Sequence, residues 1–485
     1  MKFTPSAKRI NRRDFLKLAG ITGSAAALAA CGGQTTQAPE EVQPEESGGE
    51  EQAPVEEEKV ALTFWTPGGS DQYCEGFQVI GQNYMEENPN ITMNPTLCNP
   101  TGENYDEVLL ANIAAGTPPD ATIVWNSPVS YAVRNALEEL DGPMATSKNS
   151  SLENWPEGVL GSCQYQGKTY GLPASAAPYA MYYNVDMFEA AGISSAREDF
   201  PKTWDELRML SKEFTKWDGD LLQTAGFFLL GSSGDYYNKA VQFVIWSHTN
   251  GGSVFDAENL KYTINSEENV AMMQYALEWF DEEYKGDIIS VVTSANWNAY
   301  ADGEGRPPSF QEGIHAVLDD GYWIATDMYA ADMKMKKWNV APFPIGPGGS
   351  ETASGYWPNW VVLPKGVPHK QESFDFLDYL VVDGMKVWYS IVPDLPANKK
   401  FPKDFVPQNL IDKVGDEFAT EVNTFFLNQL NYAVPMWNSP VESYYLDQLS
   451  VALEQIFSKV ATPKEALDEV QRACQEELDK TISEG

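Results

Sequence analysis

The sequence is poor in histidine, in cysteine and in positive charge. Its 485 residues include only three histidines and five cysteines, and no pair of cysteines has the spacing of a zinc site. Thirty-three basic residues face 70 acidic ones, giving a formal net charge of −37. So acidic a chain is poorly suited to the phosphates of nucleic acids or to anionic lipid surfaces. We therefore expect no metal, no cofactor and no nucleic-acid partner.

What the sequence does contain is enough apolar material for large cores. Hydrophobic residues make up 43% and aromatic residues 12% of the chain, as in well-packed globular proteins. A chain of this length exceeds a single core, so two or more domains are expected.

The N-terminus has the features of an export signal. Paired arginines in NRRDFLK (11–17) precede LAGITGSAAALAA, a run too short and too rich in small residues to remain as a membrane span. It resembles a twin-arginine signal, and LAAC (28–31) resembles a lipoprotein processing box. We expect residues 1–30 to be a signal peptide and Cys31 to carry the lipid that anchors the exported protein on the outer face of the cytoplasmic membrane. The segment 31–59 is then a disordered acidic tether.

The remaining cysteines suggest an oxidising compartment. Cys74 opens a predicted helix, and Cys98 follows a short strand, ITMNPTL, that returns over a similar length, so both should reach one edge of a sheet. This predicts a Cys74–Cys98 disulfide. A Cys163–Cys474 disulfide follows only by elimination, and free buried thiols are the alternative.

Large aromatic side chains follow the ends of predicted strands. In AVLDDGYWIATD (316–327), an apolar run ends at Gly321 and is followed directly by Tyr322 and Trp323. We expect Gly321 to keep this turn free of a side chain, so that the face of the Trp323 indole can lie against a ligand. Strands alternating with helices predict α/β layers with a largely parallel sheet, in which ligands bind at the carboxyl ends of strands. The other aromatics at predicted exits are Trp65, Trp125, Trp246, Tyr356 and Trp357. Each could be ordinary packing, but together they predict an aromatic-walled cleft. Such walls suit the C–H faces of sugars, with polar groups at the rim for the hydroxyls.

A family resemblance gives this interpretation a name. GKTYGLPASAAPYAMYYNVDMFEAAGI and FPKTWDELRMLSKEFTK, within 168–216, resemble the central signature of family 1 extracellular solute-binding proteins of carbohydrate ABC importers. AAGTPPDATIV, FQEGIHAVLDDGYW and TPKEALDEVQRACQEEL are similar to further family segments, so the resemblance runs from about residue 60 to the end.

The resemblance implies a two-lobed, periplasmic-binding-protein-like α/β fold of type II, with a ligand cleft between hinged lobes. By analogy, lobe one comprises 60–173 and 337–384, and lobe two 174–336 and 385–485. The implied partners are a sugar or oligosaccharide and the permease subunits of an ABC transporter, and we expect a monomer. Where relatives place polar residues after Gly-Leu-Pro, this chain has ASAAP, so Tyr179 is expected to compensate as a wall residue. The expected ligand-binding residues are Trp65, Ser70, Asp71, Trp125, Asn126, Tyr179, Trp246, Asp320, Tyr322, Trp323, Tyr356, Trp357, Asn359 and Asp394.

Three other functions fit parts of the sequence. A secreted glycosidase or lyase would share the tryptophans and carboxylates, but it needs two carboxyl groups flanking the scissile bond, and nothing in the sequence marks such a pair. An adhesion or scaffold lipoprotein would lack a closing cleft. Iron capture by the tyrosine pairs is disfavoured, because Tyr182 and Tyr183 would alternate faces of one strand.

Overall fold

The computed structural model describes residues 59–68, 71–93, 97–98, 100, 104–230, 236–286, 291, 294–295, 297, 307–327, 333–392 and 394–484. The expected signal peptide, Cys31, nearly all of the tether and Ser70 lie outside these ranges. Among the helices in these ranges, none combines the length and the apolar character that crossing a bilayer requires.

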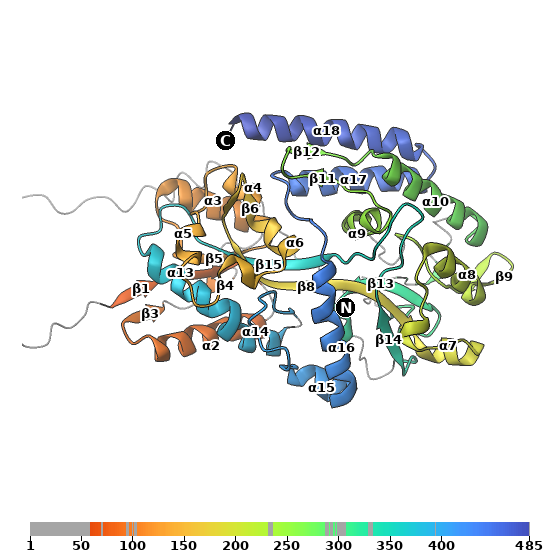
Figure 1. Ribbon diagram of the computed structural model, residues 1–485, viewed down its shortest axis with the longest axis horizontal. Coiled ribbons are helices and arrows are strands. Elements are labelled where there is room, and N and C mark those ends of the chain that lie inside the picture. Colours follow the sequence, from red (N-terminus) through yellow and green to blue (C-terminus); the bar gives the residue numbers. More distant parts are fainter. Residues whose placement is uncertain are drawn as a thin grey trace, which may run out of the picture. The chain divides into compact units, whose positions relative to one another are not determined.

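The central element is a seven-stranded sheet in the order β13-β8-β15-β5-β2-β4, with β14 also paired to β8 (Figure 1). Its strands are β2 (Phe64–Thr66), β4 (Leu97–Cys98), β5 (Ala121–Val124), β8 (Leu172–Asn184), β13 (Val317–Gly321), β14 (Trp338–Ala341) and β15 (Tyr356–Val362). The expected parallel pairing holds for β2 with β4 and β5. It is wrong for β15, β13 and β14, which pair antiparallel. These three strands are far from β8 in the sequence, and each runs in the opposite direction to β8.

Strand β8 is the longest in the sheet, and all 13 of its residues are buried. Its first half pairs with β15, while its second half lies between β13 and β14. A strand covered on both faces does not alternate between apolar and polar residues, which explains the continuous run LPASAAPYAMYYN. This strand carries Ser175 and Tyr179 into the region described below.

Shorter strands complete the β structure: β1 (Val60–Leu62), β3 (Ile91–Met93), β6 (Gln164–Tyr165), β7 (Lys168–Thr169), β9 (Lys216–Asp218), β10 (Leu221–Thr224), β11 (Phe255–Asp256) and β12 (Lys261–Tyr262). The longer helices are α2 (Asp71–Glu87), α3 (Tyr105–Ala115), α8 (Trp204–Phe214), α9 (Tyr236–Thr249), α10 (Glu267–Glu283), α13 (Lys370–Tyr379), α16 (Asp416–Gln429), α17 (Glu442–Phe457) and α18 (Pro463–Glu484). The shorter helices are α4 (Pro128–Ala132), α5 (Asp141–Met144), α6 (Glu157–Leu160), α7 (Val185–Ala191), α12 (Ile324–Asp327), α14 (Met385–Ile391) and α15 (Gln408–Val414). A π-helical turn, Leu380–Gly384, joins α13 to α14.

The start of α8 shows how the local sequence specifies structure. Thr203 precedes the helix, and its hydroxyl accepts a hydrogen bond from the backbone N–H of Glu206 at 3.3 Å. The Glu206 carboxylate in turn accepts the backbone N–H of Thr203 at 3.1 Å. This reciprocal capping box satisfies two helix-end donors, and it accounts for the Thr-Trp-Asp-Glu segment of the family signature.

The cysteines confirm one predicted disulfide and correct the other. Cys74 in α2 and Cys98 in β4 are bonded, with their Cα atoms 5.7 Å apart. Cys163 and Cys474 are both free and buried, so the predicted bridge between them is wrong. A cysteine without a disulfide partner is stable in the core, because a buried thiol packs as a small apolar side chain. Burial raises the pKa of Cys474 to about 12, which keeps that thiol protonated.

Candidate functional site

The candidate site is built on one face of β8 and β15. Trp357 and Asn359 are two residues apart on β15, so their side chains lie on the same face of the sheet. They pair in register with Ala177 and Ser175 of β8, respectively, and Tyr179 is two residues further along that face. Cross-strand partners share a face, and the sheet therefore gathers two aromatic rings, an amide and a hydroxyl side by side.

Trp323 reaches this face from β13 because Gly321 leaves room for it. Gly321 is paired with Tyr179, and a Cβ atom added to Gly321 would lie 2.1 Å from two ring carbons of Trp323. The indole thus occupies the place where a side chain at position 321 would be. Its ring meets Tyr179 edge-on at 5.3 Å between centroids, and it meets Trp357 at 6.5 Å. This confirms that the glycine before the aromatic pair is needed for space.

Trp437, which the sequence did not indicate, supports Trp357 from behind. The two rings are 5.1 Å apart in an edge-to-face arrangement. The Trp437 indole N–H donates to the backbone oxygen of Tyr356 at 2.8 Å, and the residue has a left-handed φ of 61°. No strand exit marks this position in the sequence. Only the approach of the chain before α17 to β15 reveals it.

A polar network lies at the border of the same face. Trp125, which follows β5, is 51% exposed, and its indole N–H donates to the Asn359 carbonyl oxygen at 3.1 Å. The Asn359 amide donates to Ser175 Oγ at 2.9 Å and to Asp394 Oδ2 at 3.2 Å. Ser175 belongs to the ASAAP segment, so this strand does supply a hydrogen-bonding hydroxyl despite its unusual composition.

Trp388 of α14 completes the network and was also not predicted. Its indole N–H donates to Asp394 Oδ2 at 2.7 Å. The ring is buried edge-on against Phe77 at 4.7 Å and Tyr73 at 5.8 Å. Burial raises the pKa of Asp394 to about 6, an effect that the Trp388 hydrogen bond opposes.

Three other predicted residues, Trp65, Asp71 and Asp320, retain exposed surface. Trp65 is half-buried in β2, and its backbone oxygen accepts a hydrogen bond from Thr122 at 3.2 Å. Asp71 is exposed at the first position of α2. Asp320 is half-buried, and its carboxylate accepts the Gly321 N–H at 2.7 Å.

Asn126 lines a hollow that does not include Trp323 or Trp357. Its amide donates to Asp106, and its carbonyl oxygen accepts a hydrogen bond from Ser443 Oγ at 3.0 Å. These residues line a hollow of about 320 Å³ together with Arg134 and Tyr444. Asn126 thereby links the exit of β5 to the start of α17.

Three predicted wall residues are instead core residues. Trp246, Tyr322 and Tyr356 have no exposed surface, so they offer none to a ligand. Trp246 lies within α9 and donates to Asp319 Oδ2 at 2.8 Å. The predicted strand ending at Trp246, QFVIW (242–246), is therefore wrong, because a short apolar run does not distinguish a buried strand from a buried helix. Tyr322 and Tyr356 precede Trp323 and Trp357, and their side chains point into the core.

The chain has the two-lobed, periplasmic-binding-protein-like α/β fold. The cyclic α-maltosyl-1,6-maltose binding protein from Arthrobacter globiformis superimposes with a TM-score of 0.66 at 19% identity, covering 88% of this chain and all of that one. CpMnBP1 with mannotriose bound superimposes with a TM-score of 0.62 at 19% identity, covering 86% of this chain and all of that one.

The chain belongs to the bacterial extracellular solute-binding protein family, which it matches over residues 70–386. The maltooligosaccharide ABC transporter solute-binding lipoprotein of Streptococcus pneumoniae serotype 4 is 26% identical over 461 residues, which are 90% of this chain and 93% of that protein. The arabinooligosaccharide-binding protein of Bacillus subtilis strain 168 is 23% identical over 427 residues, 84% of this chain and 90% of that protein. Family members bind solutes and are not enzymes, so the glycosidase and lyase alternative is set aside.

Proposed function

We propose that this protein captures a sugar or short oligosaccharide on the face formed by Trp323, Trp357 and Asn359, and delivers it to the permease subunits of an ABC transporter. The observation that carries the proposal is the placement of two half-buried indoles and an amide on one sheet face. The C–H face of a pyranose packs on an aromatic ring, while its hydroxyls need donors and acceptors at the edge. Trp125 adds a largely exposed ring at the border of this face.

The names of the relatives support the same class of ligand. They are binding proteins for maltooligosaccharides and arabinooligosaccharides, and the similar solved structures include one with mannotriose bound. These proteins bind different sugars, so a panel of oligosaccharides is needed to identify the ligand of this chain.

The lobes are proposed to be 60–173 with 337–384 and 174–336 with 385–485, closing on the sugar. The proposed lobe boundary at 173/174 falls just after the start of β8 at Leu172, and the boundary at 384/385 directly follows the π-helical turn Leu380–Gly384. Solution scattering tests the hinge, because sugar should reduce the radius of gyration. An unchanged radius with saturating sugar would contradict closure.

The protein is proposed to act as a monomer held on the outer face of the cytoplasmic membrane. The support is the LAAC segment ending at Cys31, preceded by the arginine-bearing signal 1–30 and followed by the acidic tether 31–59. The pneumococcal relative is also named a lipoprotein.

Thermal unfolding with maltotetraose, mannotriose and an arabinooligosaccharide tests the proposal. A sugar at 100 times its Kd should stabilise the folded state by about 2.7 kcal/mol. Trp323→Ala should abolish most of that shift. Trp217→Ala is the matched control, since Trp217 is likewise half-buried but lies on β9, and it should retain the shift. If no sugar raises the melting temperature of the unaltered protein, the proposed ligand class is wrong.

A further inference from the structure

The exposed indole of Trp125 hydrogen-bonds through its ring nitrogen to Asn359, and the buried Tyr73 hydroxyl also lies close to this N–H group. The ring is 51% exposed, so packing alone restrains it poorly. Its N–H donates to the Asn359 carbonyl oxygen at 3.1 Å. This hydrogen bond to Trp125 requires the Asn359 carboxamide to present its oxygen and not its NH₂ group.

Asp394 determines which way that carboxamide faces. The Asn359 NH₂ group donates to Asp394 Oδ2 at 3.2 Å and to Ser175 Oγ at 2.9 Å. An ionised carboxylate only accepts hydrogen bonds, so it attracts the NH₂ group and repels the carbonyl oxygen. With the NH₂ group fixed on that side, the carbonyl oxygen must face Trp125.

The carboxylate is itself fixed from behind. Trp388 is buried, and its indole N–H donates to the same oxygen, Asp394 Oδ2, at 2.7 Å. The residues that follow Asp394 run beside β8. The backbone N–H of Ala176 donates to Leu395 O at 2.8 Å, and that of Ala397 donates to Ala174 O at 3.3 Å.

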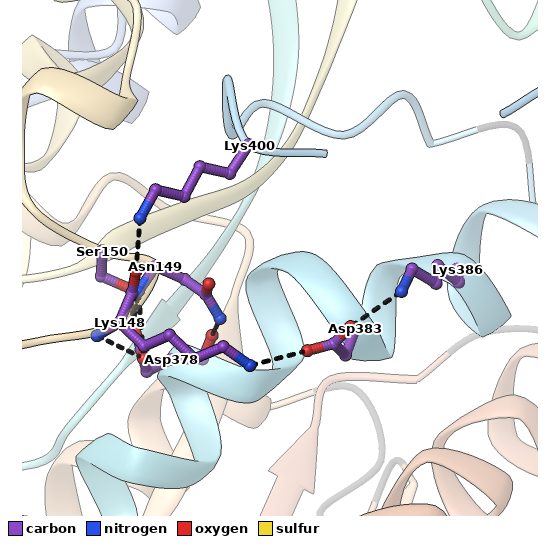
Figure 2. Close-up of polar contacts among 7 residues, drawn as sticks. All are labelled: Lys148, Asn149, Ser150, Asp378, Asp383, Lys386 and Lys400. Carbon is purple, nitrogen blue, oxygen red and sulfur yellow. Dashed lines mark hydrogen bonds and ion pairs between the residues drawn. The ribbon is translucent and has the colours of Figure 1, made fainter. Parts of the chain in front are cut away.

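The far end of this segment is fastened to the loop 148–154 (Figure 2). The Asn398 amide donates to Asn149 O at 3.0 Å. Figure 2 shows a second contact, in which the Lys400 ammonium donates to Lys148 O at 2.5 Å. The loop is clamped in turn by the buried carboxylate of Asp378, which accepts the backbone N–H of Asn149 at 3.0 Å and the Ser150 hydroxyl at 2.6 Å. The segment that follows Asp394 is thus hydrogen-bonded both to β8 and to the loop 148–154.

We propose that Asp394 is a positioning residue: through the Asn359 carboxamide it holds the exposed indole of Trp125 in one orientation, as a platform ready to receive a sugar ring. It acts on the ligand only through these two side chains, in contrast to the direct contact expected from the sequence. This inference rests on the proposed function for its ligand, but the state of the Trp125 indole exists without any ligand. Holding the ring in place before binding reduces the entropy that binding must overcome.

The first test needs no sugar. The indole N–H signal of Trp125 is identified in ¹⁵N NMR spectra by its loss in Trp125→Phe, and its hydrogen exchange is measured in the unliganded protein. Asp394→Ala should speed that exchange by roughly tenfold or more, because the hydrogen-bond chain loses its charged member. Asp394→Asn, which keeps the shape and one acceptor, should give an intermediate rate and serves if the alanine variant does not fold. Asp383→Asn removes a carboxylate on the neighbouring π-helical turn and should leave the rate unchanged.

An exchange rate that is the same in folded Asp394→Ala or Asp394→Asn as in the unaltered protein would overturn the inference. So would an equal acceleration in Asp383→Asn, because the effect would then be a general loosening.

The second test is a double-mutant cycle on binding, with maltotetraose as probe, or mannotriose if maltotetraose gives no thermal shift. Asp394→Ala should weaken binding about tenfold in the unaltered background. In the Trp125→Ala background it should weaken binding by less than about twofold, since the platform is already gone. A full loss in both backgrounds would mean that Asp394 contacts the sugar directly, which contradicts the inference. If no sugar binds the unaltered protein, the proposed function fails, while the exchange experiment still decides the role of Asp394.

Discussion

Gly321→Ala should cost the protein its sugar affinity while leaving the fold nearly intact. The added Cβ would lie 2.1 Å from ring atoms Cη2 and Cζ3 of Trp323 and 2.5 Å from Cε3. Real Cβ contacts essentially never fall below 3.0 Å, and the indole is rigid, so the whole ring must move away by about 1 Å or more. Gly321 is not among the glycines with positive φ, and its backbone therefore accepts alanine. The glycine is needed for space beside the ring.

The expected magnitudes separate binding from folding. A displaced Trp323 loses its edge-to-face contact with Tyr179, and such a pair contributes about 0.5–1.5 kcal/mol. The free energy of unfolding should therefore fall by no more than about 1–2 kcal/mol. Displacing an aromatic anchor from a binding site typically costs about 2 kcal/mol or more, which is roughly a thirtyfold loss of affinity.

Calorimetry on the unliganded variant and titration with maltotetraose or mannotriose measure the two effects. Gly142→Ala is the matched control, because no atom lies within 4 Å of its added Cβ, and it should change neither quantity. The double variant Gly321→Ala/Trp323→Ala should bind no more weakly than Trp323→Ala alone. A Gly321→Ala protein with unaltered affinity would refute the assignment of the Trp323 ring to the site. A sharply destabilised variant with unaltered affinity would show that this contact serves packing.

Three further predictions concern the rest of the chain. Cys74→Ala should lower the free energy of unfolding by about 3 kcal/mol, the chain-entropy value for a loop of this length, without changing the preferred sugar; denaturant unfolding measures this, and equal stability would mean that the crosslink contributes nothing. Glu442→Gln should stabilise the protein increasingly from pH 5 to pH 8, because burial raises the pKa of Glu442 to about 7 in the folded state. The protonated Glu442 side chain contributes its full stability below the pKa of the unfolded chain. As the pH rises through the folded-state pKa, up to about 3 kcal/mol of that stability is lost, and glutamine, which does not ionise, avoids this loss. Parallel pH profiles of the two proteins in urea unfolding would contradict that assignment. Cys31→Ala should release the exported protein from membranes while sugar binding persists, and a variant that still sediments with membranes in high salt would show another anchor.

The sequence by itself determined the family and several local devices. The segments around GKTYGLP and PKTWDEL indicated a solute-binding protein, and residues 70–386 match that family. Cys74 and Cys98 could be paired in advance, because the helix and the strand that the sequence predicts between them have lengths that nearly cancel. The role of Gly321 could also be foreseen, because the residue and the indole that needs its space are two positions apart.

Only the tertiary structure decided which aromatic side chains face outward. Tyr356 and Trp357 are successive residues of β15 and therefore point to opposite faces of the sheet, whereas Tyr322 and Trp323 lie in the turn after β13. In each pair one ring is buried and the other is partly exposed. Which member was buried depended on the elements packed behind the sheet. In both pairs the tyrosine went inward, where its hydroxyl found a partner: Tyr322 meets Tyr389 at 2.6 Å, and Tyr356 donates to Gly158 O at 2.9 Å.

The tertiary structure also supplied the partners that hold the site together. Trp388 and Trp437 carry no local signal of a binding role, and they reach Asp394 and Trp357 only because α14 and the chain before α17 are brought to the sheet. Asn359 and Trp125 are separated by 234 positions, yet they share a hydrogen bond. Local patterns report the period and the ends of helices and strands, whereas the meeting of distant segments depends on how the whole chain packs.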